Sequence, residues 1–223
     1  PPIDNWINGQ LSAGQLRHGA IEELLERDPI RLDNERVAAE LNNKIVLISG
    51  AAGSIGSEIV RQVLRYKPAR VILVDQAESA LFDLQQEING SDHLRHYADR
   101  VVFVVASVKD RFRMQKIFST YKPEIIYHAA AYKHVPLMEE NPYEAIMVNV
   151  FGTKVMADLA LAFNVRKFVM VSTDKAVNPT NVMGATKRIA EMYIQCISNG
   201  KTQFITTRFG NVLGSNGSVI PVF

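Results

Sequence analysis

The residues most able to do chemistry lie in the run from Ser172 to Lys187. Asp174 and Lys175 put a carboxyl group and an amine side by side, and Thr173 adds a hydroxyl group directly before them. An adjacent acid and base can move protons on and off a bound molecule when burial and neighbouring charges bring them toward neutral pH. The run therefore predicts a site of general acid–base chemistry, with Lys187 as a further cation.

An ordinary solvated Asp–Lys pair on a loop is the alternative, because exposed ion pairs are common and contribute little. The apolar run 168–171 before Ser172 predicts a buried parallel strand, so Thr173, Asp174 and Lys175 would lie at its carboxyl end. Open α/β sheets bind their ligands at that end, which favours the chemical interpretation. We expect a desolvated pocket that keeps a proton on Asp174 and removes one from Lys175.

Six apolar segments predict strands, and the segments between them have helical periodicity. Strands are expected at 44–49, 70–75, 101–106, 124–128, 167–172 and 203–208, and helices near 54–66, 78–89, 110–121, 142–163 and 182–199. This alternation predicts an α/β fold with a doubly wound parallel sheet of Rossmann type, in the strand order 3-2-1-4-5-6. Residues 1–43 are expected to form an N-terminal helical arm, and residues 44–223 the sheet domain.

A glycine-rich loop, Gly50-Ala51-Ala52-Gly53-Ser54-Ile55-Gly56, follows the first expected strand. Glycines at this spacing let the backbone approach a pyrophosphate, which then rests on the N-terminus of the next helix. The candidate binding residues are Gly50, Gly53, Ser54, Ile55 and Gly56. Asp75 ends the second strand, where a carboxylate accepts hydrogen bonds from ribose hydroxyls and repels a 2′-phosphate. The pattern predicts NAD rather than NADP; a surface aspartate at a strand end is the plainer alternative.

Composition and charge argue against several other classes. The chain has 223 residues, 47% hydrophobic and 22% charged, with a formal net charge of only +2. No block of Lys or Arg predicts nucleic acid binding, and no apolar run approaches the ~20 residues of a membrane span. The single cysteine, Cys196, is expected to be buried, in a protein of a reducing compartment. His128 and His134 have no Cys or carboxylate at ligand spacing, so no metal site is predicted.

Three further motifs carry a resemblance to a known family. They are Tyr127-His128-Ala129-Ala130-Ala131-Tyr132-Lys133-His134-Val135-Pro136-Leu137-Met138-Glu139, Ser172-Thr173-Asp174-Lys175-Ala176-Val177-Asn178-Pro179 and Arg208-Phe209-Gly210-Asn211-Val212-Leu213-Gly214-Ser215. With the glycine loop and Lys187, they resemble the extended short-chain dehydrogenase/reductase family, and more closely its nucleotide-sugar 4,6-dehydratases of bacterial polysaccharide biosynthesis. The resemblance covers about residues 20 to 223. It implies an NAD-dependent enzyme that converts UDP-N-acetylglucosamine, or a close relative, to a 4-keto-6-deoxy sugar.

The resemblance also implies a role for each site residue. Asp174 would protonate the C6 hydroxyl as it leaves, Lys175 would take the C5 proton, and Thr173 would bind the C4 oxygen. Lys187 would bridge the nicotinamide ribose. Cofactor contacts are implied for Ser107, Val108, Ala129, Ala130, Ala131 and Lys133, and substrate contacts for Lys133, Thr173 and Asn211.

Two positions depart from the family's pattern. Relatives have a tyrosine four residues before the helical lysine, where it takes the C4 hydroxyl proton, but this chain has Met183, and methionine cannot take a proton. Either the protein is inactive, or Asp174 or a water held by Lys187 performs that step; we favour the second, because the acid–base residues are intact. Ser107 stands where relatives often have an aspartate that contacts adenine. We expect its hydroxyl, or the Val108 backbone, to substitute with weaker adenine binding.

The resemblance further implies a membrane region before this chain and a substrate-binding part after it, both expected to be mostly absent here. The full-length protein would lie at the cytoplasmic face of the bacterial inner membrane and form a homo-oligomer, while this fragment would be soluble and turn over poorly. A nucleotide-sugar 4-epimerase is one alternative, since it shares the C4 oxidation. A noncatalytic NAD-binding module is another, made credible by Met183.

Overall fold

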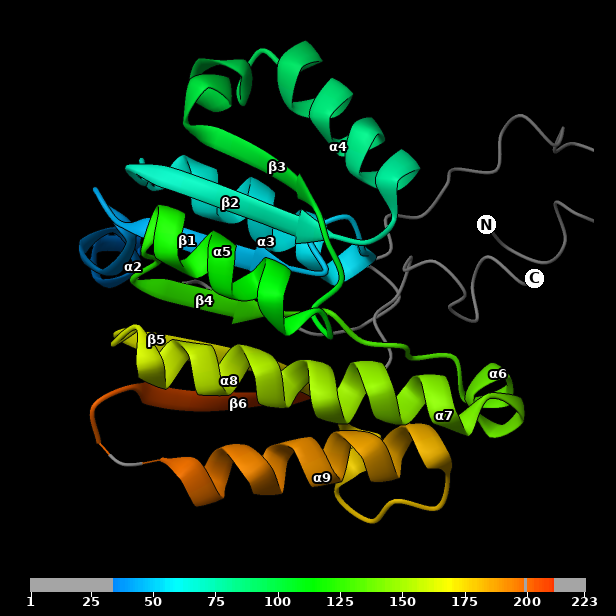
Figure 1. Cartoon of the computed structure of the whole chain (residues 1–223). Helices are drawn as coiled ribbons and strands as arrows, with labels where there is room; N and C mark the ends of the chain where they lie inside the picture. The colour runs from blue at the N-terminus through cyan, green and yellow to red at the C-terminus, as the bar shows by residue number, and fades with distance from the viewer. Residues whose placement is uncertain (1–33, 199, 211–223) are drawn as a thin grey trace, which may run out of the picture. The chain divides into compact units, whose positions relative to one another are not determined.

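The computed structural model describes residues 34–198 and 200–210, which are coloured in Figure 1; most of the predicted N-terminal arm lies outside them. Six strands form one sheet in the order β3-β2-β1-β4-β5-β6. They are β1 Ile45–Ser49, β2 Arg70–Asp75, β3 Val101–Val105, β4 Ile125–His128, β5 Lys167–Thr173 and β6 Gln203–Phe209. Every neighbouring pair is parallel. The predicted fold class and strand order are confirmed.

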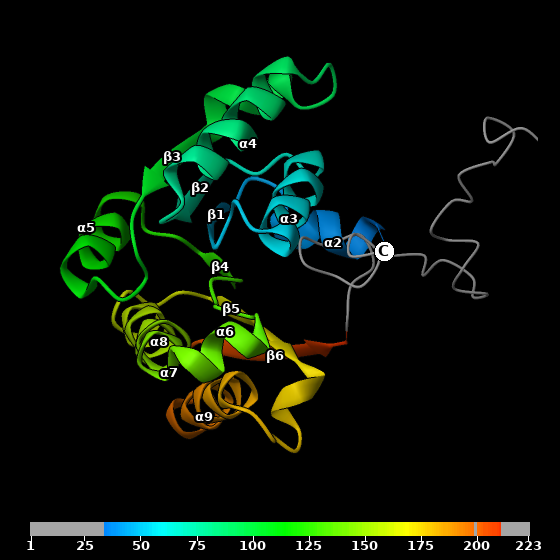
Figure 2. The same ribbon diagram turned by 90° about the vertical axis from the view of Figure 1, so that its right-hand side faces the viewer.

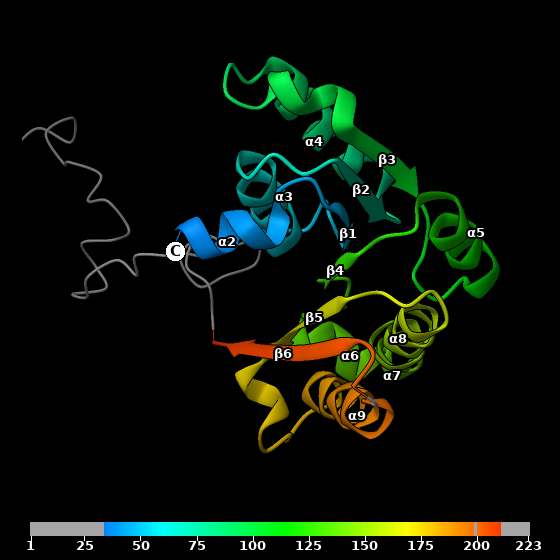
Figure 3. The same cartoon turned by 90° about the vertical axis from the view of Figure 1, so that its left-hand side faces the viewer.

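Helices cover both faces of the sheet, because alternate strand residues point to opposite faces. In β1, Val46 and Ile48 belong to one core and Leu47 to the other. The first core is completed by α2 Asn34–Leu41, α3 Ser54–Arg65, α4 Glu78–Gly90 and the 3-10 helix η3 Arg95–Arg100. The second is completed by α5 Arg111–Tyr121, α8 Thr153–Ala162 and α9 Val182–Ile197. Figures 2 and 3 show these two layers from the two ends of the strands.

The segment predicted as one helix over 142–163 changes its winding along its length. Helix α7, Pro142–Ala145, passes into a π-helix, η4 Ile146–Gly152, and then into α8; a short helix, α6 Val135–Glu140, precedes it. Gly152 ends the π-helix, and a Cβ there would lie 2.7 Å from Cγ2 of Val108, so the valine side chain would have to shift. A π-helical turn inside a longer helix is frequent at functional sites.

The same segment corrects the expectation that the chain has no run apolar enough for a membrane span. Pro142–Ala162 is, among the described residues, the one helix with sufficient length and apolar composition. About half of its apolar window is buried inside the domain, as in an ordinary core helix. Length and composition alone are therefore weak evidence for a span.

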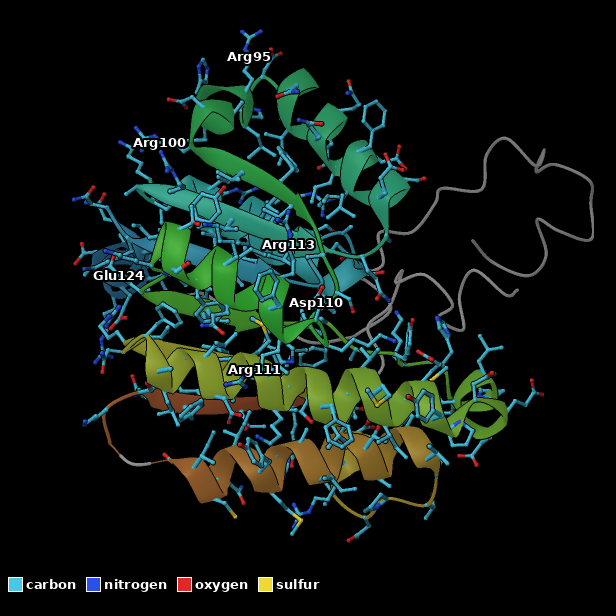
Figure 4. All side chains as sticks on the ribbon, in the orientation of Figure 1. Arg95, Arg100, Asp110, Arg111, Arg113 and Glu124 are labelled. Atoms are coloured by element: carbon cyan, nitrogen blue, oxygen red, sulfur yellow. The ribbon has the colours of Figure 1, made fainter. Side chains whose placement is uncertain are left out.

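Ion pairs join α2 and the loops around it to the amino-terminal edge of the sheet. Glu40 on α2 accepts hydrogen bonds from Arg166 Nη2 and Lys167 Nζ, both at 2.8 Å. These hydrogen bonds, with that from Arg166 the stronger, lower the pKa of Glu40 to about 2. At the same edge Glu124, labelled in Figure 4, accepts a hydrogen bond from Lys44 Nζ at 2.8 Å. Helix α2 thus packs on the sheet domain, although its residues fall within the predicted arm.

Cys196 is exposed, so the expectation that it is buried was wrong. It lies on α9, whose buried positions include Met183, Lys187, Ala190 and Ile194 at the three- and four-residue spacing of one helix face. Cys196 lies outside that buried face. The helical periodicity of the segment was predicted correctly, but the cysteine was assigned to its wrong side.

Candidate active site

The glycine loop between β1 and α3 can form only because glycine has no side chain. Gly50 has a φ of +69°, and a Cβ there would lie 2.5 Å from the backbone nitrogen of Ala130. A Cβ on Gly56 would lie 1.9 Å from the carbonyl oxygen of Gly50. Gly53 is the N-cap of α3 and has no side chain with which to cap it. An anionic group can therefore bind at the start of this helix.

Asp75, at the end of β2, holds the glycine loop in place. Its Oδ2 accepts a hydrogen bond from the backbone nitrogen of Ala52 at 2.9 Å, and its Oδ1 accepts one from Ala77 at 2.9 Å. Each carboxylate oxygen keeps a second lone pair, so a ribose hydroxyl can still donate to it. The predicted ribose contact stays a prediction. The loop-holding role is one that sequence reasoning missed.

The other predicted cofactor residues follow β3 and β4 at the carboxyl edge of the sheet, which Figure 2 views end on. The Ser107 hydroxyl is buried and has no hydrogen-bond partner among the described residues. Val108 is buried beside Gly152. Residues 129–131 are half-buried, and Lys133 is exposed.

These features fit an elongated dinucleotide. The two glycines leave no side chain above the backbone, and the uncapped start of α3 suits a pyrophosphate. The unpartnered hydroxyl of Ser107 can bond to a ligand at the end of β3. In doubly wound sheets, a dinucleotide lies along this carboxyl edge, where it would meet all of these groups.

The predicted acid and base lie in a 3-10 turn, η5 Asp174–Ala176, which Thr173 caps at the end of β5. Asp174 Oδ1 accepts hydrogen bonds from Thr173 Oγ1 at 2.8 Å, from the Lys175 backbone nitrogen at 2.8 Å and from Lys175 Nζ at 3.2 Å. The hydrogen bonds from Thr173 and Lys175 lower the pKa of Asp174. The three predicted residues are thus brought together as one hydrogen-bonded unit.

The expectation that this pair lies away from water is wrong for the structure described here. The side chains of Asp174 and Lys175 are 58% and 34% exposed. Water therefore reaches both groups. A lowered pKa also leaves Asp174 ionised, so the expectation that it holds a proton is wrong as well.

Lys187 is the buried cation of this region. It lies on α9 and is only 4% exposed, and no carboxylate of the described residues forms an ion pair with it. Burial lowers the pKa of Lys187 to about 8, against the opposing charge of Glu191. Helix α9 reaches this position because residue 184 is glycine: a Cβ there would lie 2.4 Å from the carbonyl oxygen of Lys175. The segments that carry the two lysines are therefore in direct contact.

Met183 fills space in a small apolar cluster. It is 4% exposed and packs with Met138 and Ala145, beside Tyr132. The first turn of α9 thus places a packed thioether in this cluster. Asn211, the remaining predicted substrate residue, lies outside the described residues.

His128 forms a buried hydrogen-bond chain between β1, β4 and the segment at the start of α8. Thr153 Oγ1 donates its one proton to the carbonyl of Asn149 at 2.7 Å, so it must accept from Nε2 of His128, at 2.9 Å. Nδ1 then accepts from Ser49 Oγ at 2.7 Å. His128 is a neutral structural residue with a defined tautomer. Among the described residues no group of His, Cys, Asp and Glu could hold a metal ion.

We expect His128 to make the protein less stable at mildly acidic pH. Burial, and secondarily the charge of Lys187, lower its pKa to about 3, whereas an unfolded histidine titrates near ~6.5. The unfolded state thus binds a proton that the folded state excludes. Stability should be full above about pH 6.5 and fall by up to about 1.4 kcal/mol per pH unit below it. Urea unfolding between pH 5 and 7.5 measures this slope.

The variant His128→Gln should flatten that slope, because it removes the titrating group. His134→Gln is the matched control, since His134 is exposed. Equal slopes for the wild type and His128→Gln would contradict the assignment.

Two buried polar residues support the site and were not predicted as part of it. Asn149 accepts a hydrogen bond from the Tyr132 backbone nitrogen at 2.8 Å and donates to the Tyr132 carbonyl and Thr186 Oγ1, both at 3.0 Å. It ties the loop after β4 to the π-helix and α9. Glu191 is wholly buried on α9. The sequence gives one signal for both residues, since each is a polar residue within an apolar helical segment.

The strand order, the glycine loop and the buried helical lysine define a Rossmann-type domain of the extended short-chain dehydrogenase/reductase class. The profile of the family described as "Polysaccharide biosynthesis protein" matches residues 46–223. The chain belongs to this family of polysaccharide biosynthesis proteins, as the resemblance predicted.

Individual relatives agree with this assignment. The chain is 50% identical over 227 residues to the capsular polysaccharide biosynthesis protein CapD of Staphylococcus aureus, covering 100% of this chain and 37% of that protein. It is 35% identical over 187 residues to the UDP-N-acetylglucosamine 4,6-dehydratase (inverting) of Campylobacter jejuni, covering 82% and 53%. The structure of Pen from Bacillus thuringiensis matches with a TM-score of 0.74 and 37% identity, covering 82% and 54%.

The chain thus spans between about a third and a half of the length of these relatives. One further relative is described only as a membrane protein. Two solved structures with 21% and 19% identity hold NAD, and at that identity the likeness shows the fold alone.

Proposed function

We propose that this chain is the NAD-binding and catalytic part of a UDP-N-acetylglucosamine 4,6-dehydratase of polysaccharide biosynthesis. The observation that carries the proposal is the hydrogen-bonded unit of Thr173, Asp174 and Lys175 at the carboxyl end of β5, beside the helix that holds Lys187. A dehydratase of the same substrate, 35% identical, supports the choice of substrate.

Bound NAD would accept a hydride from C4 of the sugar and return it to C6. The glycine loop and the start of α3 would hold its pyrophosphate, and Asp75 its adenine-side ribose. Lys187 would bind the other ribose. The remaining proposed contacts come from Ser107, Val108, Ala129, Ala130, Ala131 and Lys133.

The ionised state of Asp174 suggests how this protein works without the tyrosine. A carboxylate can take the proton of the C4 hydroxyl, which Met183 cannot do. Asp174 then holds the proton that the C6 hydroxyl needs to leave as water. The C4 proton and the C6 hydroxyl together make up that water, so one carboxyl group can serve both steps.

Lys175 would act on C5 between these two events. A ketone at C4 makes the C5 proton acidic, and a neutral amine can take it and later give it back to C5. Lys175 Nζ lies 3.2 Å from Asp174 Oδ1, so the proposed acid and base are adjacent. Thr173 would donate a hydrogen bond to the C4 oxygen.

Mass spectrometry of the product that the full-length protein makes from UDP-N-acetylglucosamine and NAD tests this proposal. Loss of one water from the sugar is expected. A product of unchanged mass with altered C4 configuration would favour the epimerase, and NAD binding without a product would favour the noncatalytic module.

Assembly and location are also proposals. Exposed apolar side chains on the helical segments near the site, Tyr143, Phe151, Ile189 and Met192, support a homo-oligomer. Since the relatives are longer, a region outside this chain would attach the protein to the inner membrane. Sedimentation as a monomer at micromolar concentration would contradict the oligomer.

A further inference from the structure

Glu191 is a buried carboxylate that the proposed chemistry does not use. It is 0% exposed and lies on α9 one helical turn after Lys187. Burying a carboxylate costs several kcal/mol unless charged and hydrogen-bonded partners surround it. An apolar side chain would fill the same space without that cost. The charge at this position therefore calls for an explanation.

The hydrogen-bond partners of Glu191 come from the ends of two neighbouring strands, and Arg188 on α9 adds a longer ion pair at 3.7 Å. Ser172 Oγ, on β5, donates to Oε1 at 2.6 Å. Arg208, on β6, donates from Nε to Oε1 at 2.9 Å and from Nη2 to Oε2. Burial alone would raise the pKa of Glu191, but the hydrogen bonds from Arg208 and Ser172 outweigh it and hold the pKa below its usual value. The carboxylate is thus ionised and forms a bidentate pair.

These partners directly precede the residues that the proposed reaction needs. Ser172 and Arg208 are paired across the two strands, and the next pair is Thr173 with Phe209. The Asp174–Lys175 turn begins directly after Thr173, the last residue of β5. On the β6 side, a Cβ on Gly210 would lie 3.5 Å from Asp174 Oδ2, so the end of β6 passes beside the acid.

We propose that Glu191 is a positioning residue, whose carboxylate fastens the carboxyl ends of β5 and β6 to α9 and supplies the negative charge that acts on the buried ammonium of Lys187. The inference rests on the proposed function and deepens it. One residue would set both the placement of the acid–base turn and the charge of the cofactor-binding lysine.

The proposed electrostatic effect of Glu191 on Lys187 follows from the spacing of the two residues on α9. Lys187 and Glu191 are four residues apart, hence on the same face of the helix. The oxygens of Glu191 are engaged by Ser172 and Arg208, so it acts on Lys187 without forming an ion pair. Burial lowers the pKa of Lys187 to about 8, and Glu191 works against this shift. Without Glu191, Lys187 should lose its proton at a lower pH.

Other charged groups lie on the elements packed against α9. His128 on β4 is neutral above about pH 3, and the Asp174–Lys175 pair carries both signs. The remaining groups are Arg188 on α9, Arg208 on β6, Lys167 on β5, Glu139 and Glu140 on α6, Glu144 on α7, and Lys154 and Asp158 on α8. Among all of these, the interaction of Glu191 with Lys187 is the one that raises the pKa of the lysine.

NADH affinity, followed by nucleotide fluorescence from pH 6 to 10, tests the inference without catalysis. In the wild type, affinity should fall as Lys187 loses its proton near pH 8. Glu191→Gln should move this fall to lower pH by at least about half a unit. Arg208→Gln should move it in the opposite direction, because it removes a positive charge beside the carboxylate. Loosened packing would not shift the pH of the affinity change in opposite directions in the two variants. If Glu191→Gln does not fold, Arg208→Gln still tests the inference.

Glu87→Gln is a matched control. Arg61 donates to Glu87 with the same geometry, Nε to Oε1 at 2.6 Å and Nη2 to Oε2 at 2.8 Å, but between α3 and α4. This variant should leave the pH of the affinity change where it is. The same pH in wild type, Glu191→Gln and Arg208→Gln would overturn the inference while NADH binding still supported the proposed function. A wild type that binds no NADH would contradict both.

The proposed role of Glu191 in positioning the acid–base turn is tested by the rate of dehydration. Ser172→Ala keeps the charge of Glu191 but removes its 2.6 Å hydrogen bond. We expect kcat for dehydration to fall about tenfold or more, since small misplacements of catalytic groups are costly. The KM for UDP-N-acetylglucosamine and the pH of the NADH affinity change should stay nearly constant. An unchanged kcat would overturn the positioning role.

Discussion

Replacing Gly56 with alanine should weaken NADH binding by at least about a hundredfold. The added Cβ would lie 1.9 Å from the carbonyl oxygen of Gly50, within the same loop. This oxygen belongs to the backbone, so the loop itself has to move, and overpacking of this kind costs about 1–3 kcal/mol or more. The displaced segment is the one that would hold the pyrophosphate. Fluorescence titration with NADH and urea unfolding measure the two effects.

Gly90→Ala is the control for this change. Gly90 ends α4, and a Cβ there would meet nothing within 4 Å. Its NADH affinity should equal that of the wild type within error, and its stability should not fall, because alanine favours a helix more than glycine does. If Gly56→Ala bound NADH as well as Gly90→Ala, the loop would not be the pyrophosphate site.

Replacing Lys175 with methionine should reduce dehydration by a factor of about 10²–10⁴, the usual contribution of a general base. Methionine keeps an unbranched side chain of similar length but cannot take the C5 proton. NADH affinity should change by less than about threefold, because the proposed role of Lys175 is toward the sugar. Product formation from UDP-N-acetylglucosamine and NADH titration separate the two steps.

Lys44→Met is matched to this variant. Lys44 also forms an ion pair with a carboxylate, Glu124 at 2.8 Å, and its side chain is 34% exposed, as is that of Lys175. It lies at the amino-terminal edge of the sheet, so its loss should leave dehydration unchanged. Undiminished dehydration by Lys175→Met would rule out Lys175 as the base, whereas an unimpaired conversion to a product of unchanged mass would favour the epimerase, which needs no base at C5.

The fold was predictable because its signals are local. All six predicted apolar runs form strands, and the ends of these strands differ from the predicted ones by at most one residue. Strands β1 to β6 alternate with helices, and right-handed crossovers then leave few strand orders. The glycine loop was equally clear, because Gly50 and Gly56 leave no room for a Cβ.

The errors arose where a property depends on what packs against a residue. Cys196 lies in a segment of correct helical periodicity, yet only the neighbours of α9 decide which side of the helix is covered. The exposure of Asp174 likewise depends on what surrounds the end of β5. The contacts of Asp75 with Ala52 and Ala77 were missed, since they require the loop's actual path.

The sequence by itself determined the order of strands and helices, the tight loop after β1 and the adjacent acid and base, because hydrophobic period and glycine geometry act over a few residues. Only the tertiary structure decided that Glu191 meets Ser172 and Arg208, 19 and 17 positions away. It also decided that Lys187 is buried and that Asp174 is ionised. The reason is physical: the charge state of a side chain depends on the solvent and partners around it, and folding brings those partners together from distant parts of the chain.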